Sequence, residues 1–172
     1  MLIRPATDAD TDAVWAILEP IIRAGETYTL PRDMTREDAL RFWFSPAHEV
    51  FVAENVTEGN AETAAARARI VGTYFLRPNQ LGGGSHVCNC GYMTAPSYSG
   101  RPVARAMCEH SLAHARTRGF RAMQFNFVVS TNDRAVRLWH SLGFETVGRL
   151  PKAFLHPAQG YVDALVMYRS LD

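Results

Sequence analysis

The sequence lacks any long uninterrupted run of apolar residues. Its first apolar stretch, residues 14–22, is broken by Glu19 and Pro20 and is followed by Arg23. No segment reaches the length of a membrane-spanning helix or of the apolar part of a secretory signal. We therefore expect a cytoplasmic protein that has no membrane as a partner.

The sequence also has little excess charge and few cysteines. Its 18 basic and 17 acidic residues leave a formal charge of +1, which offers no broad basic surface, so we expect no nucleic acid partner. Cys88, Cys90 and Cys108 are an odd number, which favours free thiols over a disulfide framework. His86 lies near the first two. Cys88 and Cys90 would need two more ligands for a zinc site, and no second Cys or His pair is nearby in sequence, so we expect no metal.

What is present is enough apolar material for one packed core. The 172 residues are 47% hydrophobic, which suits one domain over residues 1–172 and is too little for two. We find no internal repeat and no linker.

The first half of the sequence predicts two helices and two strands after a short initial strand at residues 2–4. Thr7 to Asp10 resembles a capping box, and the helix behind it should break near Pro20. Thr35 can cap a second helix that ends before Pro46. Residues 50–53 and 70–76 are predicted strands around a loop at 54–69, in which residues 61–68 could form a helical turn.

The second half alternates strands with helices. We expect strands at 87–94, 123–129, 144–150 and 161–168, and helices at 102–118 and from Asn132 to Leu142. The predicted class is α/β in the sense of a mixed α+β sheet with helices packed on it.

One run is more specific than these patterns. It is Asn-Asp-Arg-Ala-Val-Arg-Leu-Trp-His-Ser-Leu-Gly-Phe at residues 132–144, and it follows a strand and a helix that ends in Arg118-Gly119-Phe120. The run resembles the GNAT (GCN5-related) N-acetyltransferase superfamily. The resemblance implies a central, mixed and mostly antiparallel sheet of six to seven strands with helices on both faces. It also implies acetyl-CoA as co-substrate and an amine as acceptor.

A helix N-terminus offers unpaired N–H groups and a positive dipole end, which suit a pyrophosphate. The turn at this place is Ser99-Gly100-Arg101-Pro102-Val103-Ala104, which matches the superfamily pattern only at Ala104. Pro102 has no N–H to donate. The coenzyme-binding residues that the resemblance implies are Met93, Thr94, Gly100, Arg101, Val103, Ala104, Arg105, Asn132, Ala135 and Trp139.

Residues 86–92 and 124–132 show a closer resemblance. They are similar to a branch of fungal and bacterial enzymes that acetylate proline analogues such as azetidine-2-carboxylate, in which an asparagine lies at the substrate. Asn89 is that residue here. Asn89 and Asn126 are amides inside apolar strands, where an unpartnered amide costs about 1–3 kcal/mol. They either line the acceptor pocket or bond to neighbouring backbone.

Many members of the superfamily use a tyrosine of the last helix as the acid that protonates the leaving thiolate. Trp139 stands at that place, so Tyr92 is the substitute candidate, with core packing as its alternative role. Trp43 is the residue of the early helices that we expect at the substrate. Further candidates for the shape of the pocket are Glu26, Tyr28, Arg41, Phe42, Phe154, His156 and Tyr161.

The main hypothesis is an acetyltransferase for a small-molecule amine, an amino or imino acid. Acetylation of an antibiotic or of a protein amine is an alternative, although an aminoglycoside would require an acidic pocket. A second alternative is a catalytically reduced domain that binds acyl-CoA. The departures from the superfamily pattern at Ser99, Pro102 and Trp139 favour it. A homodimer stays open because dimers are frequent in the superfamily.

Overall fold

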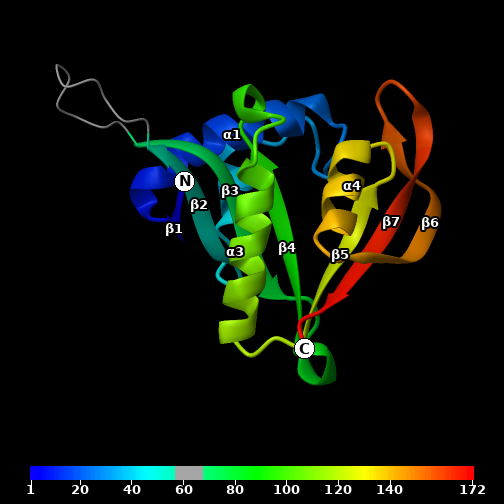
Figure 1. Cartoon of the computed structure of the whole chain (residues 1–172). Helices are drawn as coiled ribbons and strands as arrows, with labels where there is room; N and C mark the ends of the chain where they lie inside the picture. The colour runs from blue at the N-terminus through cyan, green and yellow to red at the C-terminus, as the bar shows by residue number, and fades with distance from the viewer. Residues whose placement is uncertain (57–67) are drawn as a thin grey trace, which may run out of the picture.

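The structure is a computed structural model that describes residues 1–56 and 68–172 (Figure 1). Its main elements are β1 (Leu2–Pro5), α1 (Thr11–Ala24), α2 (Arg36–Trp43), β2 (Glu49–Val56), β3 (Ala68–Pro78), β4 (Val87–Thr94), α3 (Val103–Thr117), β5 (Ala122–Val129), α4 (Asp133–Ser141), β6 (Glu145–His156) and β7 (Gly160–Ser170). This order is the predicted one. Most of the predicted loop at 54–69 and of the helical turn at 61–68 lies outside the described residues. In the described part, no helix is both long and apolar enough to cross a membrane.

Within these residues the strands form a seven-stranded sheet in the order β1-β2-β3-β4-β5-β7-β6. Neighbouring strands are antiparallel except β4 and β5, which run parallel. One core cluster joins α1 and α2 to one face of the sheet, and another joins α3 and α4 to the opposite face (Figure 1). The predicted fold is confirmed.

The first helix differs from the prediction at Pro20, because α1 continues through it to Ala24. A proline there leaves the carbonyl of Ala16 without its helical partner, but both residues are exposed and water can reach that carbonyl. The opposite side of α1 buries Leu18 completely against the sheet, and such burial outweighs one lost hydrogen bond. The helix ends at Gly25, whose φ of +66° is left-handed.

The parallel pair β4 and β5 is joined over a short length. Val87 lies opposite Ala122 and Cys88 lies opposite Met123, and beyond these positions the two strands separate. Figure 1 shows them meeting near the C-terminus and diverging toward the end of the molecule where α3 and α4 begin. The fold therefore contains a V-shaped gap in the middle of its sheet.

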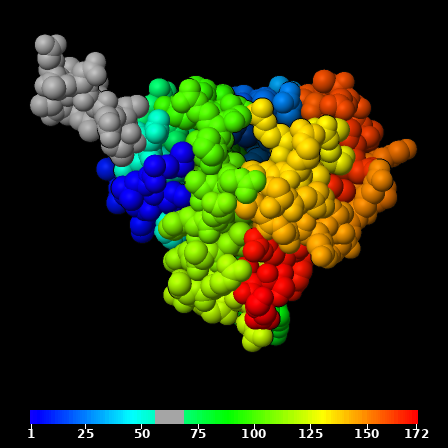
Figure 2. All heavy atoms as spheres, viewed as in Figure 1, coloured from blue at the N-terminus to red at the C-terminus, as the bar shows by residue number. Residues whose placement is uncertain are grey.

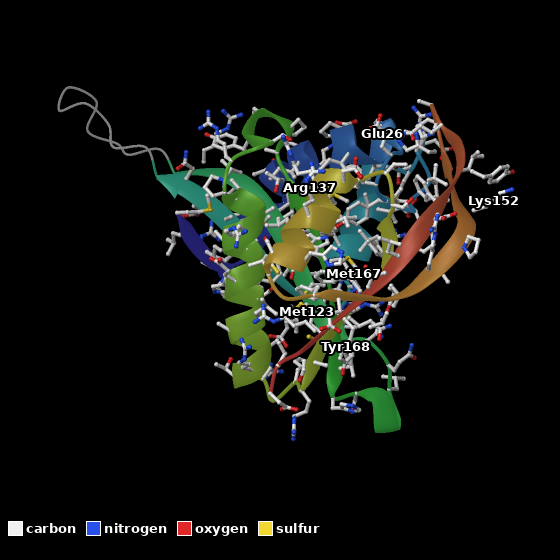
Figure 3. All side chains as sticks on the ribbon, turned by 45° about the vertical axis from the view of Figure 1, so that its right-hand side comes forward. Glu26, Met123, Arg137, Lys152, Met167 and Tyr168 are labelled. Carbon is white, nitrogen blue, oxygen red and sulfur yellow. The ribbon has the colours of Figure 1, made fainter. Side chains whose placement is uncertain are left out.

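Aromatic packing holds α4 on the β5 side of this gap. Phe125 of β5 stacks on Phe144 with ring centroids 4.3 Å apart, and Trp139 of α4 meets Phe125 at 5.1 Å. Met123 and Met167 are fully buried on the neighbouring strands β5 and β7 (Figure 3). Since α3 packs on β3 and β4, the two helices stand on opposite sides of the opening.

Candidate functional site

A cavity of about 820 Å³ occupies the gap between β4 and β5. Its wall comes from the end of α1 and the segment after it, from α2, β3, β4 and β5, from the turn before α3, and from α3 and α4. Figure 2 shows a hollow at this place, between α3 and α4. The predicted site residues in the wall are Asn89, Tyr92, Met93, Thr94, Gly100, Arg101, Ala104, Arg105, Asn126, Asn132, Ala135 and Trp139.

The first turn of α3 forms one end of the cavity. The N–H of Ala106 donates to the carbonyl of Pro102, the residue directly before α3, and this is the first hydrogen bond of the helix. The amides of Val103, Ala104 and Arg105 precede it, and a helix cannot pair these groups internally. Val103, which was predicted to bind the coenzyme, is not in the cavity wall, and its side chain is fully buried in the core. This end of the cavity suits an anion.

The turn ahead of α3 adds cationic side chains. Gly100 has a φ of +87°, a conformation that favours glycine. The N–H of Arg101 is already bonded to the carbonyl of Tyr98, while its guanidinium lies 4.7 Å from the centre of the Tyr98 ring. Arg134 of α4 donates to the hydroxyl of Ser99 from across the gap. Sequence reasoning missed Arg134, although its place in the first turn of α4 is a usable signal.

The start of α4 closes the same end from the β5 side. The side chain of Asn132 accepts from the N–H of Ala135 at 3.3 Å, which is an N-cap and leaves its NH₂ group free to face the cavity. Arg105 of α3 donates to the hydroxyl of Ser141 in α4 at 2.7 Å. Its guanidinium is thus partly engaged between the two helices.

The backbone of β4 lies along the gap. The N–H of Ala95 bonds to β3, and in an antiparallel ladder alternate residues turn to the partner strand. Met93 therefore faces β3 with its backbone, whereas Tyr92 and Thr94 turn theirs toward the gap. The hydroxyl of Tyr28 donates to the carbonyl of Tyr92 at 2.8 Å, which agrees with this alternation. An extended ligand can add to this edge as a strand would.

Asn89 lies at the point where the two strands separate. Its side-chain NH₂ donates to the carbonyl of Gln124 in β5 at 2.9 Å, which leaves its oxygen as an acceptor at the cavity wall. The NH₂ of Asn126 donates to Asn79 at 2.7 Å, and its oxygen accepts from Gln124 at 2.8 Å. Both amides thus have neighbours as partners and line the cavity as well.

The charge of the cavity has one sign. Among the described residues its wall contains no aspartate or glutamate, and its charged members are Arg77, Arg101, Arg105 and Arg134. Arg77 was not predicted from the sequence. Its position directly after an apolar stretch of β3 could have indicated it. The site repels cations and attracts anions.

Comparison with known proteins agrees with this geometry. Residues 15–144 match the model of the acetyltransferase (GNAT) family. The chain belongs to the GNAT family. N-acetyltransferase aca1 of Schizosaccharomyces pombe is 32% identical over 151 residues, which are 84% of this chain and 72% of that relative. The protein is an acetyl-CoA-dependent N-acetyltransferase.

Solved GNAT structures share the whole architecture. A GCN5-related N-acetyltransferase from Kribbella flavida is 39% identical, covers 98% of this chain and 96% of its own, and has a TM-score of 0.88. The protein yncA from Salmonella typhimurium, solved with its cofactor acetyl-CoA, is 21% identical, covers 100% and 94%, and has a TM-score of 0.80. At 21% identity, the similarity to yncA shows a shared fold alone.

The sequence names Tyr92 as the candidate acid because Trp139 occupies the place in the last helix where the resemblance implies a tyrosine. Trp139 has its ring 5.2 Å from that of Tyr92, and both line the cavity. The hydroxyl of Tyr92 lies 2.6 Å from the hydroxyl of Ser111, which itself donates to the backbone carbonyl of Cys108. Burial raises the pKa of Tyr92. Its proton is held beneath α3, as its predicted alternative role of core packing requires.

Trp43 does not reach the cavity of this GNAT enzyme. Its side chain is fully buried, donates to the hydroxyl of Thr73 at 3.0 Å and packs edge-on against Phe75 at 5.0 Å. Phe75 lies in the wall in its place. Of the further candidates Tyr28 and Phe42 line the cavity, whereas Glu26, Arg41, Phe154, His156 and Tyr161 are outside its wall; Figure 3 labels Glu26.

The cysteines lie in the core of the domain. Cys88, Cys90 and Cys108 are free and buried, and burial raises the pKa of Cys88 and of Cys108 to about 12. A search of the described residues finds no group of three or more His, Cys, Asp or Glu side chains that could hold a metal ion. These thiols pack as small apolar side chains.

Proposed function

We propose that this GNAT enzyme transfers acetyl to the amine of a small amino or imino acid, in the branch that acts on proline analogues such as azetidine-2-carboxylate. The observation that carries the proposal is the position of Asn89. It bridges β4 and β5 where they separate, and its oxygen remains free at the wall between the two ends of the cavity. An acceptor amine held there by its N–H lies beside the exposed edge of β4.

The coenzyme end would be held mainly by backbone. The amides at the start of α3 suit the pyrophosphate, with Arg101 and Arg134 adding charge at its rim. The peptide-like arm of the coenzyme suits the edge of β4 at Tyr92 and Thr94. Pro102 removes one donor, but it precedes the three free amides, so the departure from the usual glycine leaves them intact.

The chemistry would then rest on positioning. An N–H of β4 that faces the gap can donate to the thioester carbonyl and stabilise the oxyanion. The oxygen of Asn89 orients the attacking amine. Because no carboxylate lines the cavity among the described residues, the amine has to lose its proton to water. A thiol has a pKa of about 8.5, so the leaving group can depart as thiolate without an acid in α4.

The lining also separates this proposal from its alternatives. A polycationic antibiotic would bring positive charge to a wall whose charged residues are all arginines. A domain that merely binds acyl-CoA would need no room for an acceptor, and the cavity extends to Tyr28, Phe75 and Asn126, which supports the enzyme.

The test combines calorimetry with acetyl-CoA and a thiol-release assay over amino acids, imino acids, aminoglycosides and peptide N-termini. We expect binding of acetyl-CoA and turnover of a free amino or imino acid. Asn89→Ala should lower kcat/KM for that acceptor about 50-fold, whereas Gln159→Ala, an exposed amide outside the cavity, should not. Binding of acetyl-CoA without turnover of any amine would favour the reduced domain, and unchanged turnover by Asn89→Ala would remove the role of Asn89.

A further inference from the structure

Arg77 is a cationic residue of the cavity wall that has no role in the chemistry proposed above. It lies near the end of β3, directly opposite Asn89 of β4 in the antiparallel register. Side chains at opposed positions share a face of the sheet, so both lie on the side that α1 and α2 cover. Both also belong to the wall of the cavity.

The side chain of Arg77 is incompletely satisfied. Among the side-chain nitrogen and oxygen atoms of the described residues, its Nε is the one that is buried without a hydrogen-bond partner. Other arginines of the chain show the usual arrangement: Arg4 holds Asp10 with two bonds of 2.7 and 2.8 Å, and Arg121 holds Asp172. Arg77 as a whole is half-buried, and a buried N–H without a partner costs free energy because it has lost its hydrogen bond to water.

The coenzyme phosphates are too far away to be that anion. The turn that suits them follows Thr94, five positions along β4 from Asn89, which corresponds to about 17 Å of strand. Three other arginines already stand at that end. The neighbours of Arg77 in the cavity are instead Phe75, Asn89 and the acceptor-side residues.

We propose that Arg77 binds the carboxylate of the acceptor while Asn89 holds its amine. A guanidinium presents two parallel N–H groups that match the two oxygens of a carboxylate. The Cα atoms of opposed residues on antiparallel strands are about 5 Å apart, so the two side chains can reach the two ends of one α-amino or α-imino acid together. This inference rests on the proposed function and narrows its substrates to acceptors with a free carboxylate next to the amine.

The experiment compares acids with their carboxamides. Initial rates of thiol release are measured with azetidine-2-carboxylate, L-proline and the other free amino acids, and with the carboxamide of each acceptor that is acetylated. We expect the wild type to prefer the acid over its carboxamide about 100-fold in kcat/KM. Arg77→Gln should raise the KM of the acid about 100-fold and leave the carboxamide unchanged, so that the preference disappears. Arg77→Lys should retain part of it, because it keeps the charge and loses the fork.

Two measurements separate this role from damage to the fold. The Kd of acetyl-CoA should stay within twofold of the wild-type value in both variants. Arg121→Gln, which removes an exposed arginine far from the cavity, should keep the full preference for acids. Loss of acetyl-CoA binding in both Arg77 variants would overturn the proposed role, because Arg77 would then support the fold or the coenzyme and not the acceptor alone.

Each outcome bears on one proposal or on both. Acetylation of carboxamides as fast as acids by the wild type, or equal losses on both by Arg77→Gln, overturns the role of Arg77 and leaves the proposed function standing. Failure of the wild type to acetylate any amine, although acetyl-CoA binds, overturns the proposed function together with this inference.

Discussion

The two ends of the cavity are built on different principles. The proposed coenzyme end comes from two short segments, within residues 93–105 and 132–139, and offers backbone amides with arginines around them. The acceptor end draws single side chains from α1 to β5, among them Tyr28, Phe75, Arg77 and Asn126. A site made of backbone groups keeps its ligand contacts when side chains are substituted. A site made of side chains changes its specificity when one of those side chains is substituted.

This contrast explains why an atypical turn can still belong to an active GNAT enzyme. Pro102 stands where a glycine is usual, but the amides that we propose for the pyrophosphate belong to the residues after it. The proposed acceptor end has no such reserve, because there the polar groups belong to side chains, such as Asn89 and Asn126, that a substitution removes. The two ends should therefore respond to different kinds of substitution.

The substitution that should weaken binding of acetyl-CoA most is one that places a negative charge among the amides at the start of α3. Ala104 lies in the first turn of α3 and lines the cavity. Ala104→Glu should weaken binding of acetyl-CoA at least 100-fold, about 2.7 kcal/mol, because the carboxylate occupies and repels the phosphate site. Calorimetry measures the Kd directly.

Ala104→Gln is the matched control, since it has the same size without the charge. We expect a loss of about tenfold, from bulk alone. The Tm of Ala104→Glu should not fall, because an acidic residue near a helix N-terminus stabilises the helix. Equal losses in both variants would show that space rather than charge governs this end.

Asp10, directly before α1, ties the start of that helix to Arg4 of β1. Its carboxylate accepts two bonds from Arg4 and one from the N–H of Thr7, and the bonds from Arg4 hold the pKa of Asp10 well below its usual 3.8. Asp10→Asn should destabilise the fold by about 2 kcal/mol at pH 7, because it breaks a mostly buried ion pair. Denaturation with urea at several pH values measures this loss.

The sign of the pH dependence follows from the lowered pKa. The carboxylate contributes stability above the pKa of the unfolded chain, and that contribution is lost as the pH falls from about 5 through 3.8 toward the folded value. The difference between wild type and Asp10→Asn should therefore shrink at pH 3. Asp33→Asn, an exposed control, should show no difference at either pH. A gap of constant size from pH 7 to pH 3 would contradict the role of the ion pair.

The sequence places more of the cavity wall correctly around α3 and α4 than around α1, α2 and β3, for a physical reason. The motif at residues 132–144 and the helix before it are local, so their spacing specifies the backbone that binds the coenzyme. The acceptor end depends on which side chains a twisted sheet brings together, and Arg77 meets Asn89 only through the register of β3 and β4. Trp43 shows the reverse error, because the amphipathic pattern of α2 does not tell whether its side chain stops at the core or reaches the cavity.

A smaller effect sharpens the boundary of the coenzyme end. Arg134 donates to Ser99 at the turn and lines the cavity from α4. Arg134→Gln should weaken acetyl-CoA about tenfold, near 1.4 kcal/mol, and the loss should diminish as salt is added. Arg137→Gln, on the same helix but outside the cavity wall (Figure 3), should change the Kd by less than twofold. An effect on the KM of the acceptor rather than on the Kd of acetyl-CoA would place Arg134 at the wrong end.

The smallest expected effect tests whether the two ends are chemically independent. Tyr28 comes from the acceptor end, yet its hydroxyl donates to the carbonyl of Tyr92 on the edge of β4, and burial raises the pKa of Tyr28. If the hydroxyl only positions that edge, Tyr28→Phe should lower kcat/KM about fivefold, the cost of one hydrogen bond, with an unchanged pH profile. Tyr161→Phe, at an exposed tyrosine of the β6–β7 hairpin, should have no effect.

A loss above 100-fold in Tyr28→Phe, together with loss of the alkaline limb of the kcat profile, would instead make Tyr28 the acid for the leaving thiolate. In that case the acceptor end would supply the proton that GNAT enzymes usually take from the last helix, and the division between the ends would hold for binding but not for chemistry.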